Sequence, residues 1–216
     1  MHRLGQPIAL VDDLVLPRQP KRRLGEAAFL RWWREDPELH RAEWVDGEVI
    51  TVPPAGTQHN DIAALLHLVL RLFCEAHDRG KVYSDVYTRL SLPKAQFRAP
   101  DVIFVSKARL KLTRKEYFDG PPDIAFEVVS ARSAARDWHD KLQTYASAGV
   151  REYWVIDPSS QRVAAYVLRG GRYVQTRPQR DGRINSRVVR GFFIRPEWFL
   201  AAKLPEATVI LRQLGL

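Results

Sequence analysis

The stretch PDIAFEVVS (residues 122–130) predicts a strand that is buried on both faces and carries a carboxylate, Glu127, in its middle. A nearly continuous apolar run of this length is typical of a central strand covered on both sides. Burying a carboxylate without a partner costs on the order of several kcal/mol, so Glu127 needs a cation, hydrogen bonds or a raised pKa. A Mg²⁺ ion would satisfy it, and so would a paired arginine; the stretch alone leaves both open.

A second carboxylate occupies a similar place one strand earlier. Asp101 opens the apolar run DVIFV directly after Pro100. Mg²⁺ prefers hard oxygen ligands and keeps several waters, so one ion could serve Asp101 and Glu127 together. The simpler alternative is that Asp101 only caps the end of its strand.

The following segment, residues 131–149, changes to helical spacing. Asp137, Lys141 and Tyr145 are four residues apart and therefore share one helix face. If that face packs on the sheet, it brings an ammonium group to the carboxylates. Taken alone, the same spacing fits an exposed ion pair worth about 0.2–0.5 kcal/mol.

The rest of the chain predicts a mixed α/β (α+β) order. Asp46-Gly47 is a strong hairpin dipeptide, and the clearest helix offers Thr57 or Asn60 as N-cap and Gly80 as its stop. The expected elements are a helix at 26–36, a hairpin at 42–52, a loop at 53–56, a helix at 57–77, strands at 81–92 and 152–157, and a meander with strands at 162–169, 171–177 and near 186–189 before a short tail helix.

The net charge of +9 is unevenly distributed along the 216 residues. Residues 79–115 hold ten Lys/Arg against two acids, and residues 151–195 hold ten Arg against three acids. Residues 37–78, by contrast, hold seven acids against two Arg. A basic surface beside an acidic region suits a protein that holds a polyanion near a cation-binding site; a surface that is basic only for solubility is the alternative.

Other bulk features narrow the class of protein. No apolar run approaches the ~18–20 residues of a membrane span, and the N-terminus lacks an apolar signal region. The single cysteine, Cys74, lies in an apolar run and is expected to be a buried thiol, which favours a reducing cytoplasm. The chain has no Walker loop, no GxGxxG, no GxSxG and no zinc-type Cys/His spacing.

Taken together, these motifs resemble the Uma-two family of restriction-endonuclease-like proteins (DUF820) in the PD-(D/E)XK nuclease superfamily. In that family the lysine has moved from the strand of the second carboxylate into the next helix, which agrees with Val129 standing two residues after Glu127. Ala131-Arg132 departs from the family, where this turn usually has a proline. The matching stretches are EWVDGEVI (43–50), PPAGTQH (53–59), RAPDVIFV (98–105), PDIAFEVVS (122–130), the helix with Asp137, Lys141 and Tyr145, GVREYWVID (149–157) and SRVVRGF (186–192).

The resemblance implies a restriction-endonuclease-like core, in which helices flank a mixed central sheet, with an added C-terminal β-meander. It implies that Asp101, Glu127 and the backbone carbonyl of Val128 bind Mg²⁺, with Mn²⁺ as a substitute. Lys141 would orient or help deprotonate the attacking water and stabilise charge on the phosphate. Glu43 matches the family's early acid and would hold a second metal or position waters; an exposed hairpin carboxylate is the alternative.

Four further residues are expected to support this catalytic set. His59 matches a family histidine and would either contact phosphate from a helix N-terminus or cap the helix. Asp137 and Tyr145 would support Lys141 from the same helix. Asp85 would line the same site.

The implied activity is that of a Mg²⁺-dependent endonuclease acting on nucleic acid, with DNA favoured. Because no sequence-reading module is evident, little base specificity is expected, and a homodimer would suit double-strand cutting. Residues 1–24 are expected to form an N-terminal arm, 25–200 the nuclease-like domain and 201–216 a C-terminal tail. Two alternatives stay open: a catalytically silent nucleic-acid-binding or regulatory member of the fold, and a dimeric scaffold that uses its tryptophans.

Overall fold

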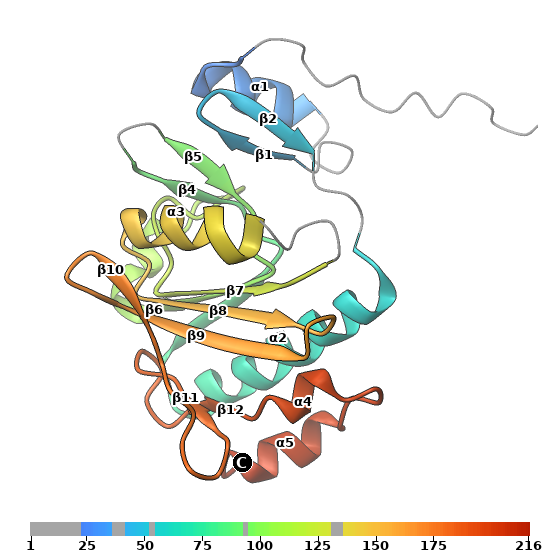
Figure 1. The fold of residues 1–216 in the computed structure, drawn as a ribbon. Helices are drawn as coiled ribbons and strands as arrows, with labels where there is room; N and C mark the ends of the chain where they lie inside the picture. The colour runs from blue at the N-terminus through green and yellow to red at the C-terminus, as the bar shows by residue number, and fades with distance from the viewer. Residues whose placement is uncertain (1–22, 36–41, 52–54, 93–94, 131–135) are drawn as a thin grey trace, which may run out of the picture.

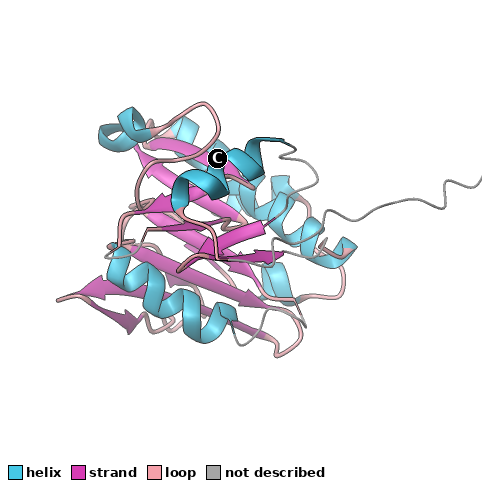
Figure 2. Cartoon of the chain, turned by 90° about the horizontal axis from the view of Figure 1, so that it is seen from above, coloured by secondary structure: helices cyan, strands magenta, loops and turns pink. Residues whose placement is uncertain are grey.

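A six-stranded mixed sheet forms the centre of the protein, with helices on both of its faces (Figures 1 and 2). The computed structural model describes residues 23–35, 42–51, 55–92, 95–130 and 136–216. The strand order is β10-β9-β8-β7-β6-β3, and only β7 and β8 run parallel. The strands are β3 (Gly80–Ser84), β6 (Val102–Ser106), β7 (Ile124–Val128), β8 (Glu152–Asp157), β9 (Arg162–Arg169) and β10 (Arg172–Gln175).

The two faces of this sheet pack against different helices. Helix α2 (Thr57–Ala76) and the C-terminal elements cover one face, in a core that includes Phe126 and Trp154. Helix α3 (Lys141–Ala148) covers the other, where Tyr145 packs near Ala125. Because successive side chains of a strand alternate between faces, β7 turns Phe126 toward α2 and Glu127 toward α3. This alternation decides which helix can meet the buried carboxylate.

A smaller sheet of order β2-β1-β5-β4 lies beyond α3 (Figure 1). Its strands are β1 (Ala42–Val45), β2 (Glu48–Thr51), β4 (Thr88–Leu90) and β5 (Gln96–Arg98). Helix α1 (Glu26–Glu35) covers one face through an aromatic cluster that includes Phe29, Trp44 and Phe97. The alternate residues, Glu43 and Arg98, therefore face the other way, toward α3.

The C-terminal elements pack on the α2 side of the large sheet. They are β11 (Ile184–Asn185), β12 (Phe193–Ile194), α4 (Glu197–Leu200) and α5 (Ala207–Gln213). Trp198 of α4 and Ile210 of α5 are buried in the same core as α2. A 3₁₀ segment, η1 (Lys107–Leu112), follows β6. Within the described part of the chain, no helix is long and apolar enough to cross a membrane.

The predicted fold class is confirmed: the protein is α+β with mixed sheets flanked by helices. The Asp46-Gly47 hairpin forms with both residues at positive φ, 50° and 91°, and Gly149 closes α3 at φ 86°. Cys74 is buried as expected, and burial raises its pKa to about 12.

Several local predictions are wrong. The expected strand 81–92 is two strands in different sheets, β3 and β4, because the chain turns at Asp85 with φ 56°. No strand forms at 186–189, and β5 was not anticipated. Helix α2 takes Gly56 as N-cap without a side-chain hydrogen bond, in place of Thr57 or Asn60, and it ends at Ala76, before Gly80. Residues 1–22 of the predicted arm (1–24), the loop residues 53–54 and the Ala131-Arg132 turn lie outside the described residues.

A buried carboxylate, Glu152, explains the segment that failed to form a strand. Glu152 opens β8 and is fully buried. Its Oε2 accepts hydrogen bonds from Ser186 Oγ at 2.7 Å, from Arg187 N at 3.2 Å and from Val188 N at 3.1 Å. The backbone N–H groups of Arg187 and Val188 are thus directed at a carboxylate, and that of Val189 at Ser186 Oγ, so these three are not available to a strand partner. Burial raises the pKa of Glu152, although these hydrogen bonds oppose the shift.

The raised pKa of Glu152 predicts a pH-dependent stability. The folded protein binds a proton at Glu152 more tightly than the unfolded chain, in which the pKa of this glutamate has its ordinary value of 4.5. The contribution of this proton to stability is therefore full below that value and is lost as the pH rises through the folded pKa. We expect the unfolding free energy of the wild type, relative to a Glu152→Gln variant, to decrease with rising pH. Urea unfolding of both proteins across a pH series measures this, and a constant or increasing difference contradicts it.

Candidate active site

Two carboxylates face each other across the pair of strands β6 and β7. Val102 pairs with Phe126 in antiparallel register, so Asp101 lies opposite Glu127 one residue further along. Side chains directly opposite in such a pair share one face, with Cβ atoms about 4.5–5.5 Å apart. Two like charges at that separation repel each other, so the pair requires positively charged or hydrogen-bonding neighbours.

Asp101 is held at the solvent-facing side of this pair. Its Oδ2 accepts a hydrogen bond from Val128 N at 2.7 Å, and its Oδ1 lies 3.1 Å from Nε2 of His59. His59 stands in the first turn of α2. Asp85, which is exposed, donates its backbone N–H to the carbonyl of Asp101 at 3.2 Å. About a fifth of the Asp101 side chain, 19%, remains accessible.

Glu127 is deeper and is bound by two groups from α3. Lys141 Nζ lies 2.7 Å from its Oε2, and Tyr145 donates its hydroxyl to Oε1 at 2.8 Å. Only 3% of the Glu127 side chain and 7% of the Lys141 side chain are exposed. The face shared by Asp137, Lys141 and Tyr145 therefore packs on the sheet, and the alternative of an exposed helical ion pair is wrong.

The start of α3 is a π-helical turn, η2 (Arg136–Asp140), held by two hydrogen bonds. Tyr153 donates its hydroxyl to the carbonyl of Asp137 at 2.8 Å, and Trp138 donates Nε1–H to Asp157 Oδ2 at 3.0 Å. Asp137 Oδ1 lies 3.2 Å from Lys141 Nζ. A π-helical turn shifts the helix register by one residue and is frequent at functional sites. Here it places the side chains of Asp137 and Lys141 side by side on the face of the helix that packs on the sheet.

Glu43 enters the cluster from the smaller sheet. It is 1% exposed, and its Oε1 lies 3.6 Å from Lys141 Nζ. Arg98 donates from Nη1 to Oε2 of Glu43 at 2.9 Å, and Ala99 N donates to Oε1 at 3.2 Å. The alternative of a solvent-exposed hairpin carboxylate is therefore wrong for Glu43.

Arg98 was missed by the sequence reasoning, which counted it only as part of a basic stretch. Its guanidinium is 4% exposed and also contacts Gln96 Oε1 at 3.2 Å and Thr144 Oγ1 of α3 at 3.4 Å. The only sequence signal was its place in RAPDVIFV, three residues before Asp101. Arg98 links the smaller sheet to α3.

The balance of charge in the cluster is negative. Four carboxylates, those of Glu43, Asp101, Glu127 and Asp137, stand against two permanent cations, Lys141 and Arg98. Fully ionised, the group carries an excess of two negative charges.

The pKa shifts follow from this excess. Burial raises the pKa of Glu127 well above its ordinary value, and the neighbouring carboxylates add to the shift while Lys141 opposes it. Burial would lower the pKa of Lys141, but Glu127, Glu43 and Asp137 raise it, so the ammonium stays charged. Burial would raise the pKa of Glu43, but Lys141 and Arg98 lower it. Burial lowers the pKa of His59, but the contact with Asp101 raises it, and the net shift is upward.

The donor set fits a hard divalent cation. Among the described residues no three His, Cys, Asp or Glu side chains converge as a ready site. Mg²⁺ does not require that, because it is commonly held by one or two carboxylates and keeps its remaining waters. Continuing the β6–β7 register places Pro100 opposite Val128, and proline has no N–H to occupy the Val128 carbonyl. An excess of two negative charges is also what one such ion would neutralise.

The structure thus brings together Glu43, Asp101, Glu127, Lys141, His59, Asp137 and Tyr145, with Asp85 at the exposed margin.

The buried ion pair of Arg98 and Glu43 yields a stability prediction. An Arg98→Met variant leaves Glu43 without its main counter-ion, so its unfolding free energy should fall by about 3–5 kcal/mol. Adding Glu43→Gln removes the uncompensated charge and should recover roughly 1 kcal/mol or more. Arg71→Met, which breaks an exposed pair with Glu75, should cost less than about 1 kcal/mol. Equal losses for Arg98→Met and Arg71→Met in urea unfolding would contradict the buried pairing.

Comparisons with known proteins identify the family and the fold of this chain. A curated relative, an uncharacterized protein (sll1609) of Synechocystis sp. strain PCC 6803, is 25% identical over 140 residues, which cover 64% of this chain and 78% of that protein. A solved structure from Anabaena variabilis, described as "a putative nuclease belonging to DUF820", superposes with a TM-score of 0.61 at 15% identity, over 87% of this chain and 97% of the other. At that identity it shows a shared fold. The sequence model of the Uma2 family, described as "Putative restriction endonuclease", matches residues 27–197, and the chain belongs to this family.

Proposed function

We propose that this protein is a metal-dependent endonuclease that hydrolyses phosphodiester bonds in nucleic acid, with DNA as the favoured substrate. The observation that carries the proposal is the Asp101–Glu127 pair, which faces Lys141 in a cluster with two excess negative charges. The description of the family as a restriction endonuclease and of the Anabaena protein as a nuclease supports the same class of reaction.

We assign the cation to the carboxylates of Asp101 and Glu127 and to the carbonyl of Val128. A bound Mg²⁺, or Mn²⁺ in its place, would lower the pKa of a bound water and polarise a phosphate oxygen. Asp101, with 19% of its side chain exposed, is the ligand nearest solvent and nucleic acid. Val128 N donates to Asp101 Oδ2 and so orients this carboxylate.

Lys141 acts in this proposal as a fixed positive charge. Because its pKa is raised, the ammonium is a poor base at neutral pH, which favours orientation of the attacking water and stabilisation of phosphate charge over proton abstraction. Asp137 and Tyr145 are positioning residues: the first contacts Lys141 and the second contacts Glu127.

For Glu43 the contacts favour a role that differs from the two expected from the sequence, which were to hold a second metal or to position waters. Both of its oxygens already accept hydrogen bonds from Arg98 or Ala99, and Lys141 lies 3.6 Å away. Two fixed cations, Arg98 and Lys141, therefore already balance the charge of Glu43, which makes it a poor ligand for a second metal. We therefore assign Glu43 to positioning Lys141, which also favours a single metal ion.

His59 and Asp85 occupy the entrance to the site. His59 lies in the first turn of the 20-residue helix α2, where backbone N–H groups favour anions, and it contacts Asp101. We propose that it approaches the phosphate of the substrate and that Asp85 restricts this entrance. We also propose that the protein acts as a homodimer in the cytoplasm.

The second candidate function is that of a nucleic-acid-binding or regulatory member of the family, which has the same site but does not cleave nucleic acid. The uncharacterized status of the Synechocystis relative is compatible with it. Against it stands the burial of three carboxylates, those of Glu43, Glu127 and Asp137, around Lys141, because such burial is costly and binding of nucleic acid alone does not require it.

Cleavage of nucleic acid tests the proposal directly. We expect the purified protein to cut supercoiled plasmid in Mg²⁺ or Mn²⁺ and to stop in EDTA. An Asp101→Asn variant, which preserves shape, should lose roughly a hundredfold or more in rate, because it removes a charged metal ligand. Asp46→Asn, an exposed hairpin substitution, is the matched control and should cut normally. Labelled single-stranded DNA and RNA in parallel identify the polymer.

The outcomes separate the two functions. Binding of nucleic acid without any cleavage supports the silent member. Cleavage that persists in Asp101→Asn or in EDTA contradicts the assigned site. Absence of both binding and cleavage removes both functions.

Metal binding has its own readout apart from activity. We expect millimolar Mg²⁺ to raise the thermal unfolding midpoint of the wild type, since a ligand that binds only the folded state stabilises it by mass action. The rise should vanish in Asp101→Asn and persist in Asp46→Asn. An equal rise in all three proteins, measured by differential scanning fluorimetry, would indicate a general salt effect and contradict the ligand assignment.

A further inference from the structure

An open surface pocket lies away from the candidate active site. It has a volume of about 320 Å³ and lies between the β9–β10 hairpin and the segment after β10. Three arginines, Arg169, Arg177 and Arg187, line it together with the polar side chains of Gln175, Thr176 and Gln179. No acidic residue is among its lining residues. We call this surface pocket the arginine pocket.

The three guanidinium groups form no ion pair with any residue in the described ranges. Nearby arginines behave differently: Arg183 and Arg195 both pair with Asp181. Like charges that share a cavity repel each other unless an anion lies between them. The arginine pocket therefore has the charge of an anion site.

The walls of the pocket are held by backbone hydrogen bonds. Thr176 N donates to Ala165 O at 2.8 Å, and Gln179 N donates to Arg183 O at 2.8 Å. Arg187 N donates to the buried carboxylate of Glu152. The backbone at three lining residues is thus fixed before any ligand arrives, which lowers the entropy cost of binding.

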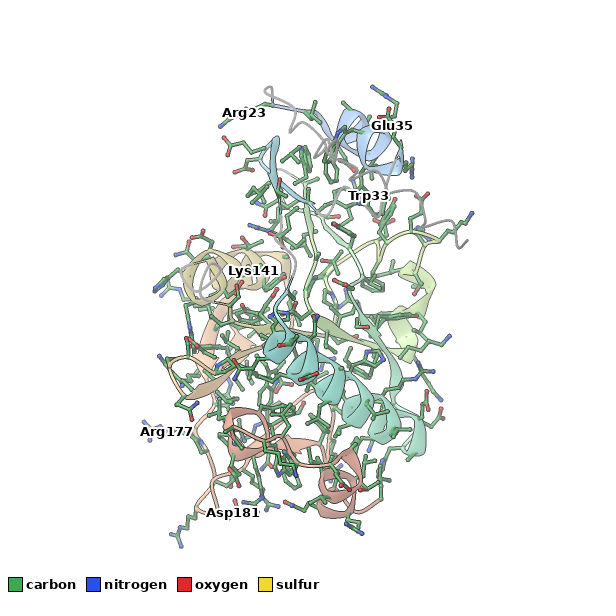
Figure 3. All side chains as sticks on the ribbon, turned by 90° about the vertical axis from the view of Figure 1, so that its right-hand side faces the viewer. Arg23, Trp33, Glu35, Lys141, Arg177 and Asp181 are labelled. Carbon is green, nitrogen blue, oxygen red and sulfur yellow. The ribbon has the colours of Figure 1, made fainter. Side chains whose placement is uncertain are left out.

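The pocket is distinct from the candidate active site. Glu127 lies opposite Val155, which pairs with Ala164, whereas Arg169 lies five residues further along β9. At about 3.3 Å per residue this is roughly 17 Å along the strands. Figure 3 shows Arg177 projecting outward from the body of the protein and Lys141 lying within it.

The pocket also opens on the other face of the sheet. Val167, another lining residue, pairs with Glu152, whose side chain points to Ser186 on the α2 side. Arg169 shares that face because it follows Val167 by two residues. A ligand in the pocket therefore cannot touch Lys141, which lies on the α3 side.

We infer that the arginine pocket binds phosphate groups of the nucleic-acid backbone, as a second contact remote from the site of cleavage. This inference rests on the proposed function for its choice of polyanion. Guanidinium forks match phosphate oxygens bidentately, and the amides and hydroxyl add neutral donors. Three further exposed arginines without a described ion-pair partner, Arg172, Arg180 and Arg190, lie within three residues of lining residues along the chain and would extend the contact beyond a single phosphate. Contacts of this kind hold nucleic acid without reading its bases.

The salt dependence of binding tests the pocket. The probe is a fluorescein-labelled 30-base-pair DNA duplex, and its dissociation constant is measured by fluorescence anisotropy in EDTA over a range of NaCl concentrations. Each lost phosphate contact lowers the slope of log K against log salt by about 0.9. For the triple variant Arg169→Ala, Arg177→Ala, Arg187→Ala we expect the slope to fall by about 3 and the dissociation constant at 0.1 M salt to rise roughly tenfold or more.

A matched control removes the same charge elsewhere. The triple variant Arg31→Ala, Arg79→Ala, Arg212→Ala changes three exposed arginines without a described ion pair and should alter the slope by less than one unit. Thermal melting by circular dichroism verifies that both variants fold. Equal slope changes in the two variants overturn the inference, because they would reflect total charge alone.

The remaining outcomes separate this inference from the proposed function. Cleavage plays no part in an EDTA measurement, so a nuclease-inactive protein that shows the slope change still supports the pocket. Where the wild type cleaves, the pocket variant should raise KM and leave kcat unchanged. Binding of the mononucleotide dTMP that only the pocket variant loses, with no change in the DNA slope, overturns the backbone contact in favour of a small phosphate ligand. A wild type that does not bind duplex DNA overturns the inference outright.

Discussion

The 2.7 Å contact between Lys141 and Glu127 is the interaction on which the arrangement of this protein depends. It joins α3 to the central strand β7, and through Glu43 it also draws the smaller sheet against the helix. A buried ion pair of this kind contributes little net stability, because removing two charges from water costs about as much as their attraction returns. A function for the cluster accounts for its presence better than stability does.

The cluster also holds more negative than positive charges, and its carboxylates differ in how deeply they are buried. Its deepest members, Glu43 and Asp137, contact fixed cations, whereas Asp101 is partly exposed and shares its oxygens between His59 and a backbone N–H. The negative charge that Lys141 and Arg98 leave uncompensated therefore lies toward the solvent. That is the side from which a cation and a phosphate would enter, and it lies between the smaller sheet and the N-terminus of α2 (Figure 1).

How much of this could be predicted from the sequence depended on the range of the interactions. The strand of Glu127, the Asp46-Gly47 turn and the face of α3 are encoded locally, by apolar runs, turn chemistry and helical spacing, and they formed as expected. Arg98 escaped notice because its partner Glu43 lies 55 residues away in the chain and in another strand. The segment 186–189 has the composition of a strand, but the N–H groups of Arg187 and Val188 bind Glu152, 35 and 36 residues earlier. Local patterns cannot reveal such partners.

Strand β8 is connected to both sites, one at each of its ends. Glu152 at its start binds the segment that carries Arg187, and Asp157 at its end binds Trp138 in the turn that carries Lys141. A single six-residue strand thus connects the arginine pocket to the candidate active site. An insertion or deletion within it would move every later side chain to the opposite face and break one connection or the other. The length of this strand therefore sets the distance between the two sites, whatever the length of the loops on either side.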